Sequence, residues 1–312
     1  IGYQIREFNP TRCIVTFDGK GGSKSRKKVF EGYKAGRENR RFRVNRQYME
    51  FLNEEEEQLS MRQQFVWLND MLDYLPVQTM IYDGIEADDT IAYLTKHTQH
   101  DLDGEVVIVS TDKDFLQLVS DKVSVFSPTK KKMYNRQVVF DEFGIWPENL
   151  LLYRTLDGDK SDNIPGIKGC GVKTLLKRFP ELSEDRTIQH EEFFKICEEK
   201  RGKIKLYDDI LKAKDQLLMN KRLMELDNPH IPTNQKLQIL DRFNVDDIEF
   251  KKLDFLRIGQ KYKVLQNWRD INDWLHSTFH NIIIIVSTKN HLLWMYSKLR
   301  FQNLMIKGFR KM

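Results

Sequence analysis

The residues of this chain best suited to chemistry are carboxylates that follow short, β-branched, mostly apolar segments. Segments that are apolar on both faces are typical of parallel strands in a sheet covered by helices on both sides. The carboxyl ends of such strands lie at one edge of the sheet, where open α/β folds place their sites. The carboxylates and the segments before them are Asp18 after Cys13–Phe17, Glu86, Asp88 and Asp89 after Thr79–Tyr82, and Asp112 and Asp114 after Glu105–Ser110.

A further acidic group lies in the segment Asp157–Asn163. Asp159 and Asp162 are three positions apart, so one helical turn would place them on the same face. Carboxylates gathered in one cleft repel one another, which raises their pKa values and costs stability. Divalent cations relieve this repulsion, and a pair of them can activate water and stabilise the leaving oxygen of a phosphodiester. The sequence therefore predicts phosphodiester hydrolysis with two or more Mg²⁺ or Mn²⁺ ions.

Each acidic group has a simpler interpretation when it is taken alone. An Asp directly after a strand, such as Asp18, is usually a turn or helix-capping residue. Asp88 and Asp89 can simply favour the dipole of a helix, and Asp159–Asn163 can be an ordinary Asx-rich turn. The combination of the groups carries the prediction.

The elements that must position these residues alternate in type along the first half of the chain. The three segments above and a fourth, Val123–Ser127, predict strands, and helical patterns lie between them at Gln58–Leu75, Asp88–His97 and Lys113–Ser120. This alternation predicts an α/β fold with a mainly parallel sheet and flanking helices. After about residue 145 only helices are expected, at Pro147–Leu156 and Val172–Phe179 and within Glu191–Leu223 and Lys236–Trp274.

Charge is unevenly distributed along the 312 residues, whose net charge is +5. Residues Lys20–Arg46 contain eleven Lys or Arg against two Glu, and residues 274–312 contain six with no Asp or Glu. Basic blocks separated from clustered carboxylates suggest a polyanion held against a metal site. The first block is expected to form either a solvated helix pair or an arch over about residues 20–50.

Other classes of protein are excluded by composition. No apolar run approaches the roughly 18–20 residues of a membrane span, and no signal-peptide pattern opens the chain. The three cysteines, Cys13, Cys170 and Cys197, fit neither a disulfide framework nor a zinc site. We therefore expect a cytoplasmic protein with reduced thiols, and we expect it to be a monomer.

Four short blocks, in order, resemble the motifs of the 5′ nuclease family. This family includes flap endonucleases, phage 5′–3′ exonucleases, RNase H-type primer-removing nucleases and the nuclease domain of bacterial DNA polymerase I, so the resemblance implies a protein of a bacterial cell or a phage-infected host. The resemblance implies a PIN-like (Rossmann-like) catalytic domain over residues 1–145. A helical DNA-binding region over 146–281 and a basic tail over 282–312 would follow. The matching blocks are Ile14–Gly19 with Tyr33–Arg37, Gly84–Thr90, Val109–Gln117 and Gly158–Thr174.

The resemblance also implies roles for individual residues. Lys34 and Arg26 match catalytic basic residues, and Lys34 would contact the scissile phosphate. Arg37 would lie in the arch through which a 5′ single strand passes, and Lys113 would bind nucleic acid. Tyr33 would stack on a terminal base, although a core aromatic is the simpler interpretation of this residue. The residues that match the family's metal ligands are Asp18, Glu86, Asp88, Asp89, Asp112, Asp114, Asp159 and Asp162.

The glycine-rich stretch Ile164–Gly171 looks like the hairpin of a helix–hairpin–helix module of the three-helix type, at about residues 158–180. Such a module grips the backbone of a duplex without reading its sequence. Gly166, Gly169 and Gly171 would let the backbone approach a phosphate, and Lys168 and Lys173 would add contacts. The family resemblance further implies a K⁺ ion held by backbone carbonyls. A simple glycine-rich turn is the alternative.

These observations predict a structure-specific 5′–3′ exonuclease or flap endonuclease that removes primers and flaps in replication. Its substrates would be branched or gapped DNA and RNA–DNA 5′ ends, with single-stranded-DNA-binding protein and other replication proteins as candidate partners. The family's first strand would precede Cys13, so we expect the sequence to be truncated at its N-terminus. Two alternatives stay open: a branched-DNA-binding protein with an incomplete nuclease site, and a PIN-type ribonuclease.

Overall fold

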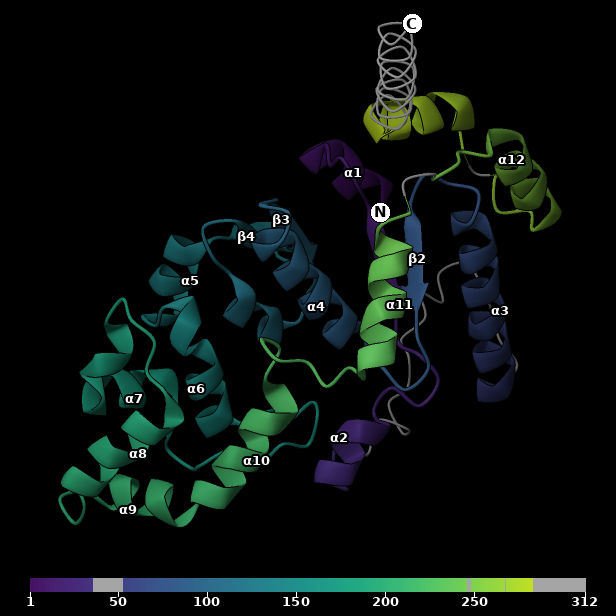
Figure 1. Ribbon diagram of the computed structural model, residues 1–312. Coiled ribbons are helices and arrows are strands. Elements are labelled where there is room, and N and C mark those ends of the chain that lie inside the picture. Colours follow the sequence, from purple (N-terminus) through teal and green to yellow (C-terminus); the bar gives the residue numbers. More distant parts are fainter. Residues whose placement is uncertain (36–52, 246–247, 267, 283–312) are drawn as a thin grey trace, which may run out of the picture. The chain divides into compact units, whose positions relative to one another are not determined.

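The computed structural model describes residues 1–35, 53–245, 248–266 and 268–282 (Figure 1). The expectations for Arg37, for the arch beyond residue 35 and for the tail after residue 282 therefore lie outside the described residues. The chain divides into two compact units. The first unit contains the described parts of residues 1–15, 43–80 and 240–312, and the second unit contains those of 16–42 and 81–239.

The four predicted strands are present as β1 (Ile14–Phe17), β2 (Gln78–Ile81), β3 (Val106–Val109) and β4 (Val123–Ser127). Among the described residues they form two sheets instead of one, because β1 pairs with β2 while β3 and β4 belong to a three-stranded sheet. β3 and β4 are parallel, as predicted. A short strand that the sequence pattern does not predict, β5 (Lys132–Tyr134), runs antiparallel to β4. The mixed α/β architecture with a small parallel sheet is confirmed.

Helices account for most of the remaining chain (Figure 1). The first unit contains α1 (Gly2–Phe8), α3 (Glu54–Leu72) and α12 (Lys252–Lys261), and α11 (Thr233–Phe243) crosses from the second unit into the first. The helices of the second unit are α2 (Lys24–Val29), α4 (Ala87–His100), η2 (Lys113–Leu118, a 3₁₀ helix), α5 (Arg136–Phe143), α6 (Pro147–Asp157), α7 (Val172–Arg178), η3 (Pro180–Ser183, also 3₁₀), α8 (His190–Glu199), α9 (Lys205–Lys212) and α10 (Lys214–Met224).

Local sequence signals explain where several helices begin and end. Asn53 and Asn135 precede α3 and α5, and each side chain accepts a hydrogen bond from a backbone N–H of the first turn. Gly144 ends α5 in a left-handed conformation with φ of 67°. α6 starts with Pro147, which has no N–H to leave unpaired at that position.

The core of the second unit joins the strands to the helices that follow them. Val123 and Val125 of β4 belong to the same buried cluster as Leu156 of α6. The cluster continues to Phe179 and Phe193, whose ring centroids are 4.5 Å apart. This shared core fixes α6, and the acidic segment that follows it, against the sheet whose strand β3 precedes Asp112 and Asp114.

In the first unit, α3 and α12 pack through aromatic and polar contacts. Trp67 stacks on Tyr262 with ring centroids 5.1 Å apart, and the Tyr262 hydroxyl donates to Asp70. Among the described residues, no helix has both the length and the apolar character needed to cross a membrane. All three thiols are free; Cys170 and Cys197 are buried and Cys13 is half-buried.

Candidate functional site

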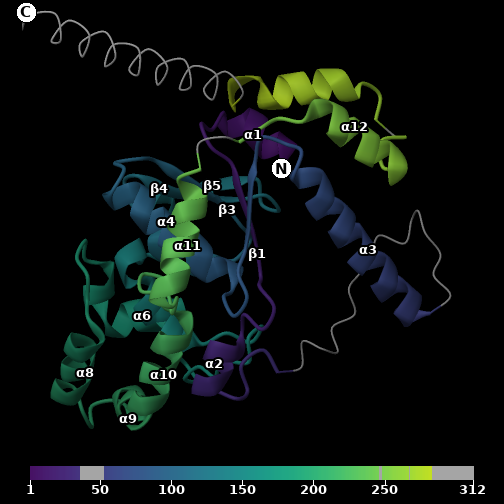
Figure 2. The same cartoon turned by 45° about the vertical axis from the view of Figure 1, so that its right-hand side comes forward.

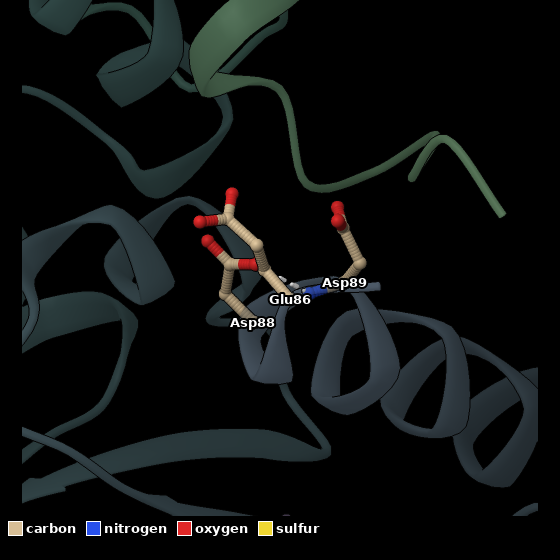
Figure 3. A group of neighbouring side chains, drawn as sticks. All are labelled: Glu86, Asp88 and Asp89. Carbon is tan, nitrogen blue, oxygen red and sulfur yellow. Dashed lines mark hydrogen bonds between the residues drawn. The ribbon is translucent and has the colours of Figure 1, made fainter. Parts of the chain in front are cut away.

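The first group of carboxylates in the second unit lies at the N-terminus of α4. Glu86 is the residue that precedes the helix, and Asp88 and Asp89 lie in its first turn. One carboxylate oxygen from each residue lies within 4.8 Å of the others. Figure 3 shows all three side chains extending from this end of the helix. The positive end of the helix dipole favours negative charge at this position.

Two basic side chains neutralise part of this charge. Arg26 of α2 is only 3% exposed and donates to both carboxylate oxygens of Asp89, at 2.9 and 2.8 Å. The same guanidinium also contacts Glu86 and Asp88. Lys34 donates from its Nζ to Oε1 of Glu86. The sequence-predicted basic residues Arg26 and Lys34 therefore meet the first carboxylate group directly.

In spite of these cations, two of the three carboxylates have pKa values above their usual range. Desolvation, with Asp89 and Glu86 nearby, raises the pKa of Asp88 to about 7 despite the opposing effect of Arg26. Desolvation likewise raises the pKa of Asp89. The pKa of Glu86 is lowered, because its bonds to Arg26 and Lys34 outweigh its burial. A further cation would relieve the remaining repulsion, and carboxylate oxygens are ligands that hard divalent cations prefer.

Asp18 lies beside the same helix end. Its Oδ1 accepts a hydrogen bond of 2.8 Å from the backbone N–H of Ala87, the first residue of α4. This is the capping contact that is the simpler interpretation of Asp18. The same contact brings the Asp18 carboxylate to the end of α4 that carries Glu86.

The second group of carboxylates surrounds Arg154 of α6. The Arg154 Nε donates to Oδ1 of Asp114 at 2.9 Å, and its Nη2 donates to Oδ2 of Asp159 at 2.6 Å. Asp112 precedes η2 and accepts a bond of 2.9 Å from the backbone N–H of Asp114. Arg154 is a site residue that the sequence reasoning missed. Its one signal is an arginine inside an otherwise apolar helical segment.

The environment of this second group also shifts its pKa values. Burial raises the pKa of Asp114 to about 6, helped by Asp112 and Asp159 and opposed by Arg154. The pKa of Asp159 is lowered, because hydrogen bonds from Ser161 and the charge of Arg154 outweigh its desolvation. As in the first group, an arginine bridges carboxylates without neutralising all of their negative charge.

A chain of contacts links the two groups. Asp159 accepts hydrogen bonds from the backbone N–H groups of Ser161 and Asp162, at 2.6 and 3.2 Å. The backbone carbonyl of Asp162 then accepts a bond of 2.8 Å from the N–H of Lys34, whose side chain binds Glu86. Lys34 has a left-handed backbone with φ of 57°. The predicted carboxylates therefore belong to one connected arrangement within the second unit.

Tyr33 differs from the expectation of a base-stacking aromatic. Its side chain is 2% exposed, and its hydroxyl lies 3.2 Å from Oε2 of Glu86. The ring packs in a small buried cluster with Ile164 and Leu223. In this structure Tyr33 is a core aromatic that supports the carboxylates, because neither face of its ring is open to a base.

The segment after Asp159 forms a short hairpin, in which Asp159 and Ile164 exchange backbone hydrogen bonds of 2.9 and 2.8 Å. Gly166 is required there, because a Cβ at this position would lie 2.0 Å from the carbonyl oxygen of Asp157. The other residues expected to bind nucleic acid are exposed; they are Lys113, Lys168, Gly169, Gly171 and Lys173.

Known proteins share much of this chain. Residues 2–144 match the family model described as the 5′-3′ exonuclease, N-terminal resolvase-like domain. DNA polymerase I of Bacillus subtilis is 32% identical over 226 residues, which cover 70% of this chain and 22% of that protein. The 5′-3′ exonuclease of Aquifex aeolicus is 32% identical over 179 residues, which cover 56% of this chain and 55% of that protein. The matches thus span between about a fifth and just over half of these relatives.

Solved structures share the fold. The T5 D15 protein co-crystallised with metal ions superposes with a TM-score of 0.59 at 23% identity, over 82% of this chain and 89% of that one. The bacteriophage T5 D15 flap endonuclease, in a pseudo-enzyme-product complex with DNA and metal ions, superposes with a TM-score of 0.58 at 24% identity. That match covers 83% of this chain and 88% of the phage protein.

Proposed function

We propose that the chain is a metal-dependent, structure-specific 5′–3′ exonuclease and flap endonuclease, because residues 2–144 match the family model of the 5′-3′ exonuclease, N-terminal resolvase-like domain. Its substrates would be branched or gapped DNA and RNA–DNA 5′ ends, cut during removal of primers and flaps. The observation that carries the proposal is the carboxylate group of Glu86, Asp88 and Asp89 in contact with Arg26 and Lys34.

The oxygen-only donor set fits Mg²⁺ or Mn²⁺. Each group of carboxylates would hold one metal ion. The first ion would be held by Glu86, Asp88 and Asp89, with Asp18 beside them. The ligands of the second ion would be Asp112, Asp114, Asp159 and Asp162. Such ions supply an activated water and stabilise the leaving oxygen when they are bound. The pKa values of about 7 for Asp88 and about 6 for Asp114 support this assignment, since burial, with neighbouring carboxylates adding to it, disfavours the charged form that a bound cation would stabilise.

The two basic residues of the first group would have different tasks. Arg26 is 3% exposed, and its N–H groups donate to carboxylates and to the carbonyl of Leu223. It would therefore hold the ligands in position. The Lys34 side chain is 17% exposed, and its ammonium forms a point contact with Glu86. Lys34 would therefore be the cation that turns to the scissile phosphate, where it would stabilise charge that develops in the transition state.

The hairpin and α7 would grip the duplex part of the substrate. The backbone around Gly166 is too close to Asp157 for any side chain, and Lys168 and Lys173 are exposed beside it. The close approach and the exposed lysines support the proposed helix–hairpin–helix module at about residues 158–180, whereas its K⁺ ion rests on the family resemblance alone. Contacts of this type would recognise the DNA backbone and not its sequence.

Cleavage of a 5′-labelled flap tests the proposal. We expect cutting near the junction with Mg²⁺ and none with EDTA. The variant Asp112→Asn with Asp114→Asn should bind the flap with nearly unchanged affinity and fail to cut it, since Asn keeps the cap at Asp112 but removes the charge. Tight binding of branched DNA without any cutting by the unmodified chain would instead favour a binding protein. Preference for unbranched RNA would favour a PIN-type ribonuclease.

A further inference from the structure

A cleft lies beside Arg26, and its other lining residues take no part in the arrangement described above. Its volume is about 450 Å³, which lies within the range of sites that accept small ligands or parts of larger ones. The residues that line it are Ser25, Arg26, Lys28, Val29, Arg222 and His230. None of them is acidic, so the cleft suits an anion.

Two helices hold the cleft in a fixed geometry. Ser25 and Lys28 belong to α2, and Arg222 belongs to α10. The helices lie side by side (Figure 2), joined by a buried hydrogen bond of 2.9 Å from Nε of Arg26 to the carbonyl oxygen of Leu223. Because Leu223 follows Arg222 directly, this bond sets the distance between the basic side chains of the two helices.

The basic side chains of the cleft are free to meet an anion. Lys28, Arg222 and His230 are exposed. In the part of the chain that the structure describes, no carboxylate forms an ion pair with Lys28 or Arg222. Arg26, in contrast, directs its Nη atoms to Asp89 and Glu86. The cleft therefore has its own positive charge, separate from the charge that neutralises the carboxylates.

The cleft also adjoins the first carboxylate group. The side chain of Arg26 lines the cleft and binds Asp89. His230 lines the cleft too. An anion in the cleft would thus lie next to the place where the carboxylates would hold a metal ion.

We propose that this cleft binds a backbone phosphate of the substrate strand, adjacent to the phosphodiester that is cut. The inference rests on the proposed nuclease function. Lys and Arg side chains are the usual partners of phosphate, and such contacts fix the register of a strand without reading its bases. By holding a neighbouring phosphate, the cleft would set which linkage reaches the carboxylates.

The test combines variants of the protein with single neutral phosphates in the DNA. The variant carries Lys28→Gln and Arg222→Gln. The matched control carries Arg201→Gln and Lys205→Gln, which remove the same charge at two exposed positions elsewhere in the unit. Binding of a 5′-flap oligonucleotide is measured in EDTA, with one methylphosphonate at each successive position near the junction. Circular dichroism checks that each variant is folded.

We expect one position, or two adjacent positions, at which the methylphosphonate weakens binding about 5–10-fold in the unmodified and control proteins, and has no effect in the Lys28/Arg222 variant. The slope of log affinity against log salt should fall by about 1 in that variant. Equal sensitivity of all proteins at every position would overturn the proposal.

Flap cleavage with Mg²⁺, measured in parallel, separates the phosphate-binding cleft from the nuclease function. Cleavage without this coupling defeats the phosphate cleft alone, whereas coupling without cleavage supports the cleft and defeats the nuclease function.

Discussion

At the residue scale, the main feature of the site is that two arginines each bridge more than one carboxylate. Arg26 joins Asp89 to Glu86, and Arg154 joins Asp114 to Asp159. Desolvation of these groups opposes their attraction, so an intact bridge adds little net stability. Removal of one partner is different, because it leaves buried charges without compensation.

Substitution of Arg26 should therefore destabilise the fold strongly. We expect Arg26→Met to lower the free energy of unfolding by about 3–5 kcal/mol, because Asp89 would stay buried without its cation and Glu86 would keep only Lys34. Urea unfolding in EDTA measures the loss. Lys27→Met is the matched control, since Lys27 is an exposed neighbour on the same helix and should change stability by under about 0.5 kcal/mol.

Mg²⁺ provides a second readout for the same variant. If the carboxylates form a metal site, Mg²⁺ should raise the melting temperature of Arg26→Met more than that of the unmodified protein, because the ion replaces the lost positive charge. Equal shifts in both proteins would contradict a metal site at Glu86, Asp88 and Asp89.

Lys34 should affect turnover far more than substrate affinity. We choose Lys34→Asn, because Asn tolerates the left-handed conformation at φ of 57° while the ammonium is removed. We expect kcat on a flap substrate to fall by about 10²-fold or more, with a change in Kd of less than about 3-fold. Single-turnover cleavage and binding in EDTA give the two values. A similar loss in both would reduce Lys34 to an ordinary phosphate contact.

The sequence revealed part of this site and concealed another part, for a physical reason. Carboxylates such as Asp18 and Glu86 could be found because they follow strand patterns, and strand ends meet at a sheet edge. Arg154 could not be found, because its role depends on the packing that brings α6 against η2. For Tyr33 the simpler interpretation, a core aromatic, agrees with the structure, but its partners Ile164 and Leu223 are distant in sequence and could not be predicted.

At the element scale, the strands with strong local patterns were predicted and the weaker ones were not. β-branched runs such as Val106–Val109 are visible in the sequence, whereas β5 has only three residues and depends on pairing with β4. The segment Lys113–Leu118 has a helical pattern but forms a 3₁₀ helix, which periodicity alone does not separate from an α-helix over so few residues. Strand pairing is a long-range property, so the division into two sheets was not predictable.

The hairpin after α6 allows a prediction at this scale. A methyl group at Gly166 would lie 2.0 Å from the Asp157 carbonyl oxygen, so Gly166→Ala must push the hairpin away from α6. We expect a loss of more than about 2 kcal/mol, as for other overpacked sites, together with loss of flap cleavage because Asp159 would move. Denaturant unfolding and the cleavage assay measure both effects.

Gly171→Ala is the control for Gly166→Ala. Gly171 precedes α7, has a negative φ, and would place a Cβ in open space. Its replacement should cost no more than about 1 kcal/mol. If the two variants lose equal stability, the close approach of the backbone at Gly166 is not what shapes the hairpin.

At the scale of the whole molecule, the core that joins strands to helices should make stability depend on pH. His190, the first residue of α8, is 4% exposed, and its Nε2 lies 3.4 Å from the Thr155 hydroxyl of α6. Desolvation, with the charge of Lys221 adding to it, lowers the pKa of His190 from 6.5 to about 4. The folded protein therefore keeps this imidazole neutral at pH values where the unfolded chain protonates it.

The sign of the effect follows from this difference in proton binding. Between pH 6.5 and about 4 the unfolded state binds the extra proton, so the contribution of neutral His190 is fully present above pH 6.5 and is lost as the pH falls to about 4. The loss should amount to roughly 3 kcal/mol, from about 1.4 kcal/mol per pKa unit.

Urea unfolding across this pH range should show a steeper decline in the free energy of unfolding for the unmodified protein than for His190→Leu. His100→Leu, which alters an exposed histidine of the same unit, should decline like the unmodified protein. Parallel curves for the unmodified protein and His190→Leu would mean that His190 titrates alike in both states, and that the core does not hold it neutral.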